Sequence, residues 1–130
     1  MEILIKNVRA CDPQCGLDSI TDIAVDGGVI TAIGADIEPE EKTRVIDGKG
    51  RLCAVPGLFD MHVHFRDPGL TYKEDIITGA NAAKAGGFTG VACMPNTKPP
   101  IDSPELVEYV FDKAKKTGID VIPYATVTKA

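Results

Sequence analysis

The chain has 130 residues, of which 44% are hydrophobic and 25% charged, and its formal net charge is −5. This composition is typical of a globular protein, and the acidic balance disfavours a nucleic-acid partner or an anionic membrane surface. No apolar run approaches the roughly 18 residues of a membrane span, and the first residues resemble a strand rather than a signal peptide, so the sequence predicts a cytoplasmic protein with four free cysteines.

The first part of the chain, residues 1–55, is predicted to be a small β-rich domain. Strand patterns occur in five segments: 3–8, 19–26, 29–34, 44–47 and 51–55. The Asp-Gly-Gly run at 26–28 is a strong hairpin signal between two of them. The Asp-Gly-Lys-Gly run at 47–50 predicts a second hairpin, and a turn-rich loop is expected at 11–18.

Residues 56–69 read Pro-Gly-Leu-Phe-Asp-Met-His-Val-His-Phe-Arg-Asp-Pro-Gly, so turn signals bracket an extended segment. We predict a strand here, in which alternate side chains share a face. One face then carries ionisable groups: Asp60, His62, His64 and Arg66. The other face is apolar: Phe59, Met61, Val63 and Phe65. Because a row of ionisable groups is costly to bury without partners, the polar face is predicted to bind a ligand.

The rest of the chain, within a predicted second domain at 56–130, alternates between helical and extended patterns. A helix is predicted from Thr71, whose spacing to Glu74 is that of a capping box, to the glycine pair at 86–87. A second helix is predicted after Ser103, with proline at its first position. Buried strands are predicted at 88–94 and 119–125. The β-α-β-α-β order, with a period of about 30 residues, indicates parallel βα units and an α/β fold class.

The two histidines of the chain, His62 and His64, are candidate metal ligands. At positions i and i+2 of a strand, their Cα atoms are roughly 7 Å apart and their imidazoles lie on the same side, so both can reach one ion. Neutral imidazole suits zinc or a similar divalent ion. The alternative is a pair of histidines that are satisfied by hydrogen bonds alone. The flanking Asp60 and Arg66 favour the metal.

Arg66 and Asn96 are candidates for binding a small anionic group. Each follows the end of a predicted strand, where the active sites of βα barrels lie. Neighbouring parallel strands are about 4.8 Å apart, so the two side chains can converge. A guanidinium fork together with an amide donor suits a carboxylate. Taken singly, Arg66 is also explained by a surface salt bridge and Asn96 by a turn.

Two segments resemble the dihydroorotase family of the amidohydrolase superfamily. Residues 60–69 and 71–75 are similar to its first barrel strand and the following loop, and the Cys-Met-Pro-Asn-Thr run at 93–97 is similar to its second-strand motif. Residues 1–55 resemble its small β-rich subdomain. The Asp-x-His-x-His pattern is shared by much of the superfamily, whereas the Arg-Asp-Pro-Gly and Pro-Asn-Thr patterns are narrower. The resemblance implies the first βα units of a (β/α)₈ TIM barrel, truncated in this chain.

The resemblance also implies a reaction and roles for individual residues. His62 and His64 would bind zinc, as one or two ions, while His64, Arg66 and Asn96 would contact the substrate. Asp60 would orient the metal-binding histidines through hydrogen bonds without binding the metal itself. Asp67 would cap the following turn. The implied reaction is the zinc-dependent, reversible hydrolysis of the cyclic amide of dihydroorotate to N-carbamoyl-L-aspartate in pyrimidine biosynthesis.

The remaining residues of such a site have no counterpart in this sequence. A bridging carboxylate or carboxylated lysine, two further histidines and a catalytic aspartate would lie on later strands, so we predict no catalytic acid or base here. A full barrel takes roughly 250 residues. We therefore expect the isolated 130-residue chain to be inactive. We also expect it to associate, either as a homo-oligomer or with the missing remainder of the chain.

Two other functions stay open at this point. An allantoinase or hydantoinase shares the His-x-His pattern, although its ring substrates lack the carboxylate that Arg66 and Asn96 would bind. A non-catalytic, amidohydrolase-like scaffold is the second alternative, and the presence of both His62 and His64 argues against it.

Overall fold

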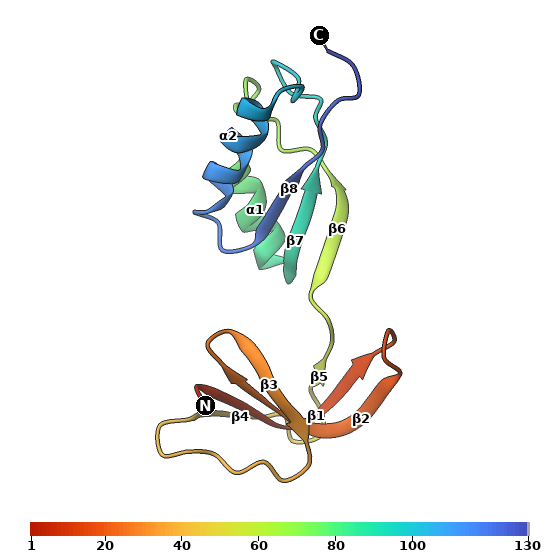
Figure 1. The fold of residues 1–130 in the computed structure, drawn as a ribbon, viewed down its shortest axis with the longest axis vertical. Helices are drawn as coiled ribbons and strands as arrows, with labels where there is room; N and C mark the ends of the chain where they lie inside the picture. Colours follow the sequence, from red (N-terminus) through yellow and green to blue (C-terminus); the bar gives the residue numbers. More distant parts are fainter. Residues whose placement is uncertain (130) are drawn as a thin grey trace. The chain divides into compact units, whose positions relative to one another are not determined.

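The computed structural model describes residues 1–129, which form two compact units that divide between Pro56 and Gly57. The first unit is a five-stranded sheet (Figure 1). Its strands are β1 (Ile3–Asp12), β2 (Leu17–Asp26), β3 (Val29–Gly34), β4 (Arg44–Asp47) and β5 (Cys53–Ala54). The order is β3-β2-β1-β4, and β5 also pairs with β1. No helix within the described residues is long and apolar enough to cross a membrane.

β1 and β2 are longer than the sequence pattern predicts. Residues on both sides of the predicted loop at 11–18 continue the antiparallel ladder, from Arg9 opposite Ile20 to Asp12 opposite Leu17. The alternating sequence pattern of β1 ends early because the hydrogen-bonded pairing with β2 shifts register between Ile5 and Val8. The hairpin between β2 and β3 is confirmed: Asp26 pairs with Val29, and both intervening glycines have positive φ, as two-residue hairpin turns of the primed types require.

The second predicted hairpin is wrong. β4 and β5 do not pair with each other, because both run parallel to β1, one on each side of its register shift. The turn between them follows the irregular part of β1: the backbone N–H of Gly48 donates to Lys6 O at 2.7 Å, and that of Gly50 donates to Asn7 O at 2.7 Å. The turn signal at 47–50 was therefore sound, but it does not determine the partner of the strand that follows.

A buried carboxylate fixes this irregular stretch of β1. Asp22, 4% exposed, accepts the backbone N–H of Asn7 at 2.9 Å and that of Ile37 at 3.0 Å. Its Oδ2 lies 3.5 Å from Nζ of Lys6. The hydrogen bond from Asn7, followed by that from Ile37 and the charge of Lys6, outweighs the effect of burial and lowers the pKa of Asp22 below its ordinary 3.8.

We expect the substitution Asp22→Asn to destabilise the first unit by about 2 kcal/mol at pH 7, since hydrogen bonds to a charged group are lost. Because the folded-state pKa is lowered from 3.8, the carboxylate contributes fully above that value and its contribution disappears as the pH falls. Urea unfolding at neutral pH and at about pH 3, followed by hydrogen exchange of β1 and β2 amides, measures the difference.

The matched control is Asp18→Asn. Asp18 also pairs with a basic side chain, Arg9 at 2.7 Å, but both side chains are more than half exposed. Solvent screens an exposed pair, so we expect a much smaller loss of stability than for Asp22→Asn. An Asp22→Asn effect of equal size at both pH values would contradict the role given to its charge.

The second unit is a three-stranded parallel sheet in the order β6-β7-β8, with two helices on one face (Figure 1). Its elements are β6 (Leu58–Val63), α1 (Ile76–Ala85), β7 (Phe88–Cys93), α2 (Pro104–Ala114) and β8 (Asp120–Pro123). The α/β class and the β-α-β-α-β order predicted from the sequence are confirmed. The strands and α2 are each shorter than their predicted segments by a few residues at most. α1 differs more, because it begins at Ile76 instead of Thr71.

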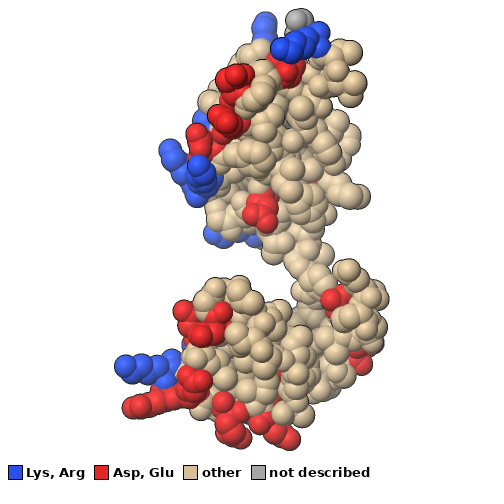
Figure 2. Space-filling model, in the orientation of Figure 1, with Lys and Arg blue, Asp and Glu red and all other residues tan. Residues whose placement is uncertain are grey.

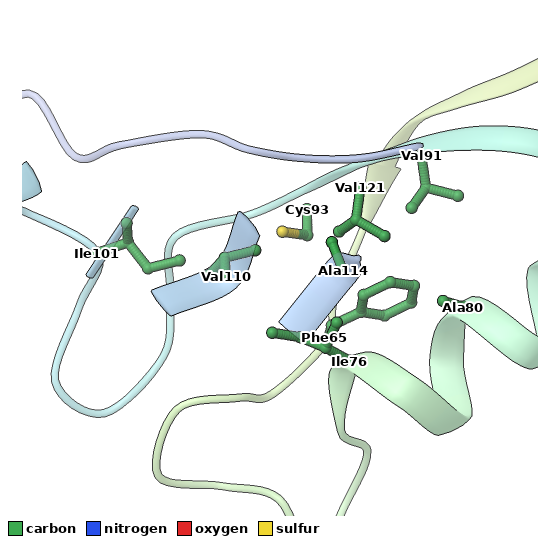
Figure 3. Packing of buried hydrophobic residues seen from close by; sticks show 9 residues of the cluster. All are labelled: Phe65, Ile76, Ala80, Val91, Cys93, Ile101, Val110, Ala114 and Val121. Atoms are coloured by element: carbon green, nitrogen blue, oxygen red, sulfur yellow. The ribbon is translucent and has the colours of Figure 1, made fainter. Parts of the chain in front are cut away.

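The core of this unit lies between the helices and the sheet. Figure 3 shows its nine buried members: Phe65, Ile76, Ala80, Val91, Cys93, Ile101, Val110, Ala114 and Val121. The ring of Phe65 lies directly on α1 at Gly79, where a Cβ would stand only 2.4 Å from a ring carbon. Glycine at that position allows the segment after β6 to pack tightly against the helix.

The apolar face predicted for β6 is only partly buried. Val63 and Phe65 pack into the core, whereas Met61 is 72% exposed and Phe59 lies half-exposed against Gly90 of β7. β6 is an edge strand, and few charged side chains cover it in Figure 2, whereas the helices carry both signs of charge. The strict alternation predicted for this strand is wrong between Asp60 and Val63, because the pairing with β7 shifts register there: Asp60 lies opposite Val91 and Val63 opposite Cys93, two residues of the same face of β7.

Helix α1 begins later than predicted. Its N-cap is Asp75, whose side chain accepts the backbone N–H of Thr78 at 2.8 Å, while the Thr78 hydroxyl reaches back to Asp75. The capping box predicted at Thr71 is wrong, because residues 66–73 form turns, including a bond from the Lys73 N–H to Leu70 O at 3.0 Å. α2 begins after Ser103, as predicted, with Pro104 in its first turn.

Candidate functional site

The candidate residues lie where the strands of the second unit end. β6, β7 and β8 are parallel, so their carboxyl ends share one edge of the sheet. Backbone hydrogen bonds continue past the strands: the N–H of Met94 donates to Val63 O at 2.9 Å, and that of Tyr124 donates to Cys93 O at 2.9 Å. The segments after β6 and β7 therefore lie side by side, and this edge positions the side chains that follow.

His62 and His64 lie close together. Their ring centroids are 5.1 Å apart with an interplanar angle of 64°, and both side chains are exposed. β6 ends at Val63, so His64 follows the strand rather than lying in it. Because zinc binds imidazole nitrogen at about 2.0–2.1 Å, two rings at this separation can share one ion.

Asp60 fixes the backbone of this stretch. Its carboxylate accepts the backbone N–H of His62 at 3.0 Å. Within residues 1–129, no group of three or more His, Cys, Asp and Glu side chains is placed to hold a metal. The residues at this edge thus fit part of a metal site, through two imidazoles.

His64 has a second contact that orients its ring. Its Nδ1 lies 2.8 Å from Oδ1 of Asn96, which follows β7. With the amide oxygen as acceptor, Nδ1 carries the proton and Nε2 keeps a free lone pair for a ligand. The sequence predicted that Asn96 would meet Arg66 at a ligand. The structure joins Asn96 to His64, and Arg66 is half-buried in the same segment, so their convergence on a carboxylate stays a prediction.

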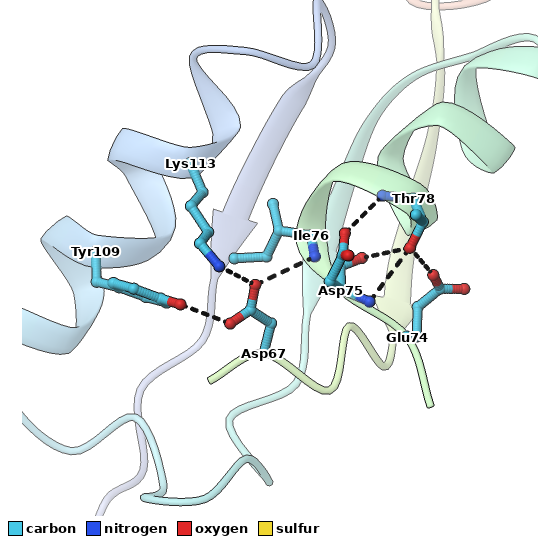
Figure 4. Close-up of polar contacts among 7 residues, drawn as sticks. All are labelled: Asp67, Glu74, Asp75, Ile76, Thr78, Tyr109 and Lys113. Carbon is cyan, nitrogen blue, oxygen red and sulfur yellow. Dashed lines mark hydrogen bonds and ion pairs between the residues drawn. The ribbon is translucent and has the colours of Figure 1, made fainter. Parts of the chain in front are cut away.

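The role of Asp67 was missed by the analysis of sequence patterns. It was predicted to cap the turn after it, but its side chain is 1% exposed and lies under both helices (Figure 4). Its carboxylate accepts hydrogen bonds from the hydroxyl of Tyr109 and from Nζ of Lys113, each at 2.7 Å. It also accepts the backbone N–H of Ile76, the first residue of α1, at 3.5 Å. No local pattern could have revealed this, because both side-chain partners lie more than 40 residues away.

Lys113 is held in its charged form by this arrangement. Burial opposes the charge, but the hydrogen bonds with Asp67 and Tyr109 outweigh it and raise the pKa of Lys113 above its ordinary value. The ammonium also lies 4.8 Å from the centroid of the Tyr109 ring, a favourable cation–π distance. A buried carboxylate, a phenol and an ammonium thus form one closed group.

The two strand-end loops touch through their backbones. The N–H of Lys98 donates to Pro68 O at 3.0 Å. Gly69, with φ of 89°, lies so close to Lys98 that a Cβ would stand 1.7 Å from the carbonyl oxygen of Lys98. Only glycine fits both the positive φ and this contact. The loop that carries Arg66 is thereby held against the loop that carries Asn96.

Comparison with known sequences gives a consistent picture. A model of the family described as dihydro-orotase-like matches residues 50–129. Proteins named dihydroorotase from Trichlorobacter lovleyi and Geobacter sulfurreducens are each 49% identical to this chain over 130 residues. These alignments cover 99% of this chain and 30% of each relative, so the chain spans about a third of the length of the curated relatives it matches.

Solved structures show the same architecture. The L-hydantoinase (dihydropyrimidinase) from Arthrobacter aurescens is 28% identical with a TM-score of 0.78, over 95% of this chain and 27% of its own. The D-hydantoinase (dihydropyrimidinase) from Thermus sp. is 30% identical with a TM-score of 0.77, over 98% of this chain and 28% of its own. The chain is therefore similar in fold to proteins that are named hydantoinase.

Proposed function

Because the chain belongs to the dihydro-orotase-like family, we propose that it supplies part of the active site of a dihydroorotase. Such an enzyme reversibly hydrolyses the cyclic amide of dihydroorotate to N-carbamoyl-L-aspartate. The observation that carries the proposal is the pair of adjacent imidazoles, with Asn96 bound to His64, at the carboxyl edge of a parallel sheet. The 49% identity to proteins named dihydroorotase supports this substrate over a hydantoin.

We further propose that β6-α1-β7-α2-β8 forms the beginning of a (β/α)₈ barrel, with residues 1–55 as a small β subdomain and the barrel from residue 56. The parallel order of these strands, with sequential strands side by side, is that of consecutive barrel units. The TM-scores of 0.77 and 0.78 against hydantoinases support this arrangement.

His62 and His64 are the residues of this chain that would hold a zinc ion, His64 through Nε2. The ion would supply a polarised carbonyl and an acidified water, which is the chemistry that amide hydrolysis needs. Asn96 keeps the proton of His64 on Nδ1 through the 2.8 Å contact, and Asp60 holds the backbone N–H of His62. These two contacts fix the direction in which the imidazoles present their lone pairs.

Arg66, with Asn96, would bind the carboxylate of dihydroorotate. His64, which was predicted as a third contact to the substrate, has no free donor for it, because Nδ1 faces Asn96 and Nε2 would face the ion. The guanidinium offers two parallel donors that match a carboxylate in one plane. The amide nitrogen of Asn96 is available for this purpose, because its oxygen faces His64. The carboxylate is what distinguishes this substrate from a simple hydantoin or dihydropyrimidine. Arg66 is therefore the residue that would set substrate preference.

The substitution Arg66→Lys tests this function in the full natural chain that carries these residues. We expect kcat/KM for dihydroorotate to fall by a factor that corresponds to about 2 kcal/mol of lost transition-state stabilisation. Lysine keeps the positive charge but loses the two parallel N–H donors of the guanidinium. Zinc content, measured by atomic absorption, should stay unchanged. Turnover of dihydroorotate, hydantoin and dihydrouracil is measured side by side.

The control is Arg51→Lys, an exposed arginine of the first unit, which should change neither value. Three outcomes would count against the proposal. A preference of the unchanged protein for hydantoin would favour a hydantoinase. Loss of zinc without loss of preference would contradict the role of Arg66, and lack of turnover with every substrate would favour a scaffold.

A further inference from the structure

The buried group of Asp67, Tyr109 and Lys113 has no part in the proposed chemistry, yet it lies beside the residues that have one. We propose that it is a positioning device that fixes the segment carrying His64 and Arg66, and so determines how tightly the substrate carboxylate is bound. This inference rests on the proposed function. None of the three side chains is proposed to touch the substrate.

The first support is the way in which successive residues of this segment divide. Val63, Phe65 and Asp67 point toward the helices: Phe65 and Asp67 are buried, and Val63 packs against the same core. His64 and Arg66 alternate with them: His64 is exposed, and Arg66 is half-buried. Each site residue therefore lies between two anchored neighbours. Movement of either anchor would shift the side chain between them.

The second support is that the contacts of Asp67 are directional. Two apolar anchors can slide, because burial of apolar surface has no preferred direction. The Asp67 oxygens instead receive three donors from two helices: the hydroxyl of Tyr109, the ammonium of Lys113 and the first N–H of α1 (Figure 4). Three donors on one carboxylate fix both its place and its orientation relative to α1 and α2.

The third support comes from the energetics of buried ion pairs. Such a pair often stabilises a fold no more than apolar side chains of the same volume would, because both charges must leave water. The Asp67 side chain is fully buried while that of Lys113 is 35% exposed, so the carboxylate bears most of this cost. Burying this ion pair directly after Arg66 costs free energy without a matching gain in stability. The fixed position that the pair imposes on the segment explains its presence there.

The test compares Lys113→Met with the double variant Asp67→Leu/Lys113→Met in the full natural chain. Lys113→Met leaves a buried carboxylate unpaired, so we expect a lower Tm and a KM for dihydroorotate raised about tenfold, as small displacements of a binding group produce. The double variant removes both charges. Its Tm should recover, whereas KM should stay raised, with a smaller change in kcat and unchanged zinc content.

Two further variants keep the test decisive. Tyr109→Phe keeps the ring and removes one hydrogen bond, so it should fold and raise KM about threefold even if the double variant fails to fold. Lys115→Met is the control, because Lys115, at the end of the same helix, forms an exposed pair with Asp112, also at 2.7 Å. It should change neither Tm nor KM.

The outcomes separate the two hypotheses. If KM returns to normal together with Tm in the double variant, or stays normal in Tyr109→Phe, the group is merely structural and the positioning role is rejected while the function stands. If the unchanged protein does not turn over dihydroorotate, the proposed function is rejected, and this role with it.

Discussion

Replacing His62 or His64 by alanine is expected to remove the metal and the activity together in the full natural chain. Changes to residues that only support metal ligands cost about 10–100-fold in affinity or activity, so loss of a ligand should exceed 100-fold by that measure. The reason is geometric: the two rings, 5.1 Å apart, are the imidazoles of the chain, and neither can replace the other. Zinc per chain and dihydroorotate turnover are measured on the same dialysed sample.

The comparison for this experiment is Asn96→Ala. It removes the hydrogen bond to His64 Nδ1 but leaves both imidazoles in place, so zinc should bind more weakly and still be retained at saturating concentration. The two histidines are not ligands if the double variant His62→Ala/His64→Ala holds as much zinc as the unchanged protein. In that case hydrogen bonds alone account for them.

Gly69→Ala is expected to be the most damaging single-methyl change in the second unit. The added Cβ would stand 1.7 Å from the carbonyl oxygen of Lys98, and a φ of 89° disfavours any side chain. The loops that carry Arg66 and Asn96 must then separate. We expect kcat/KM for dihydroorotate to fall on the order of 100-fold, the effect of a displacement of about 1 Å, together with a lower Tm.

Gly87→Ala isolates the steric part of this effect. Gly87 has nearly the same φ, 87°, but a Cβ there would meet nothing within 4 Å. It should lower stability by about 1 kcal/mol through the backbone conformation alone and leave kcat/KM unchanged. Equal losses of activity in both variants would show that the contact with Lys98 does not hold the site together. Steady-state kinetics and thermal unfolding of the two proteins decide between these outcomes.

Periodicity and turn residues predicted most of the second unit, because each of its elements has a local signature. Alternation located the strand before His64, and Ser103 with Pro104 located the start of α2. The start of α1 was misplaced because two consecutive segments, 71–74 and 75–78, have the spacing of a cap, and only the turns at 66–73 decide between them. A capping pattern marks a position where a helix can begin, and the conformation of the preceding loop decides whether the helix begins there.

Two features could not be predicted because they depend on partners that are distant in the sequence. The turn at 47–50 was recognised, but the pairing of β4 and β5 with β1 depends on a register shift inside β1 that no residue pattern announces. The burial of Asp67 depends on Tyr109 and Lys113. Among the site residues, His62, His64 and Asn96 were located at the correct edge because parallel strands bring their ends together, whereas the bond between His64 and Asn96 was missed.

The division of residues 62–67 into anchors and site residues has a consequence for how this segment can change over time. Substitutions can alter His64 or Arg66 with little effect on Phe65 or Asp67, because Phe65 and Asp67 are buried whereas His64 is exposed and Arg66 is half-buried. A change in the length of the segment, by contrast, would disturb both sets. Deleting or adding one residue would exchange the sets, so that an imidazole would be driven into the core and a phenyl ring into water. We therefore expect natural variants of this segment to keep a constant number of residues.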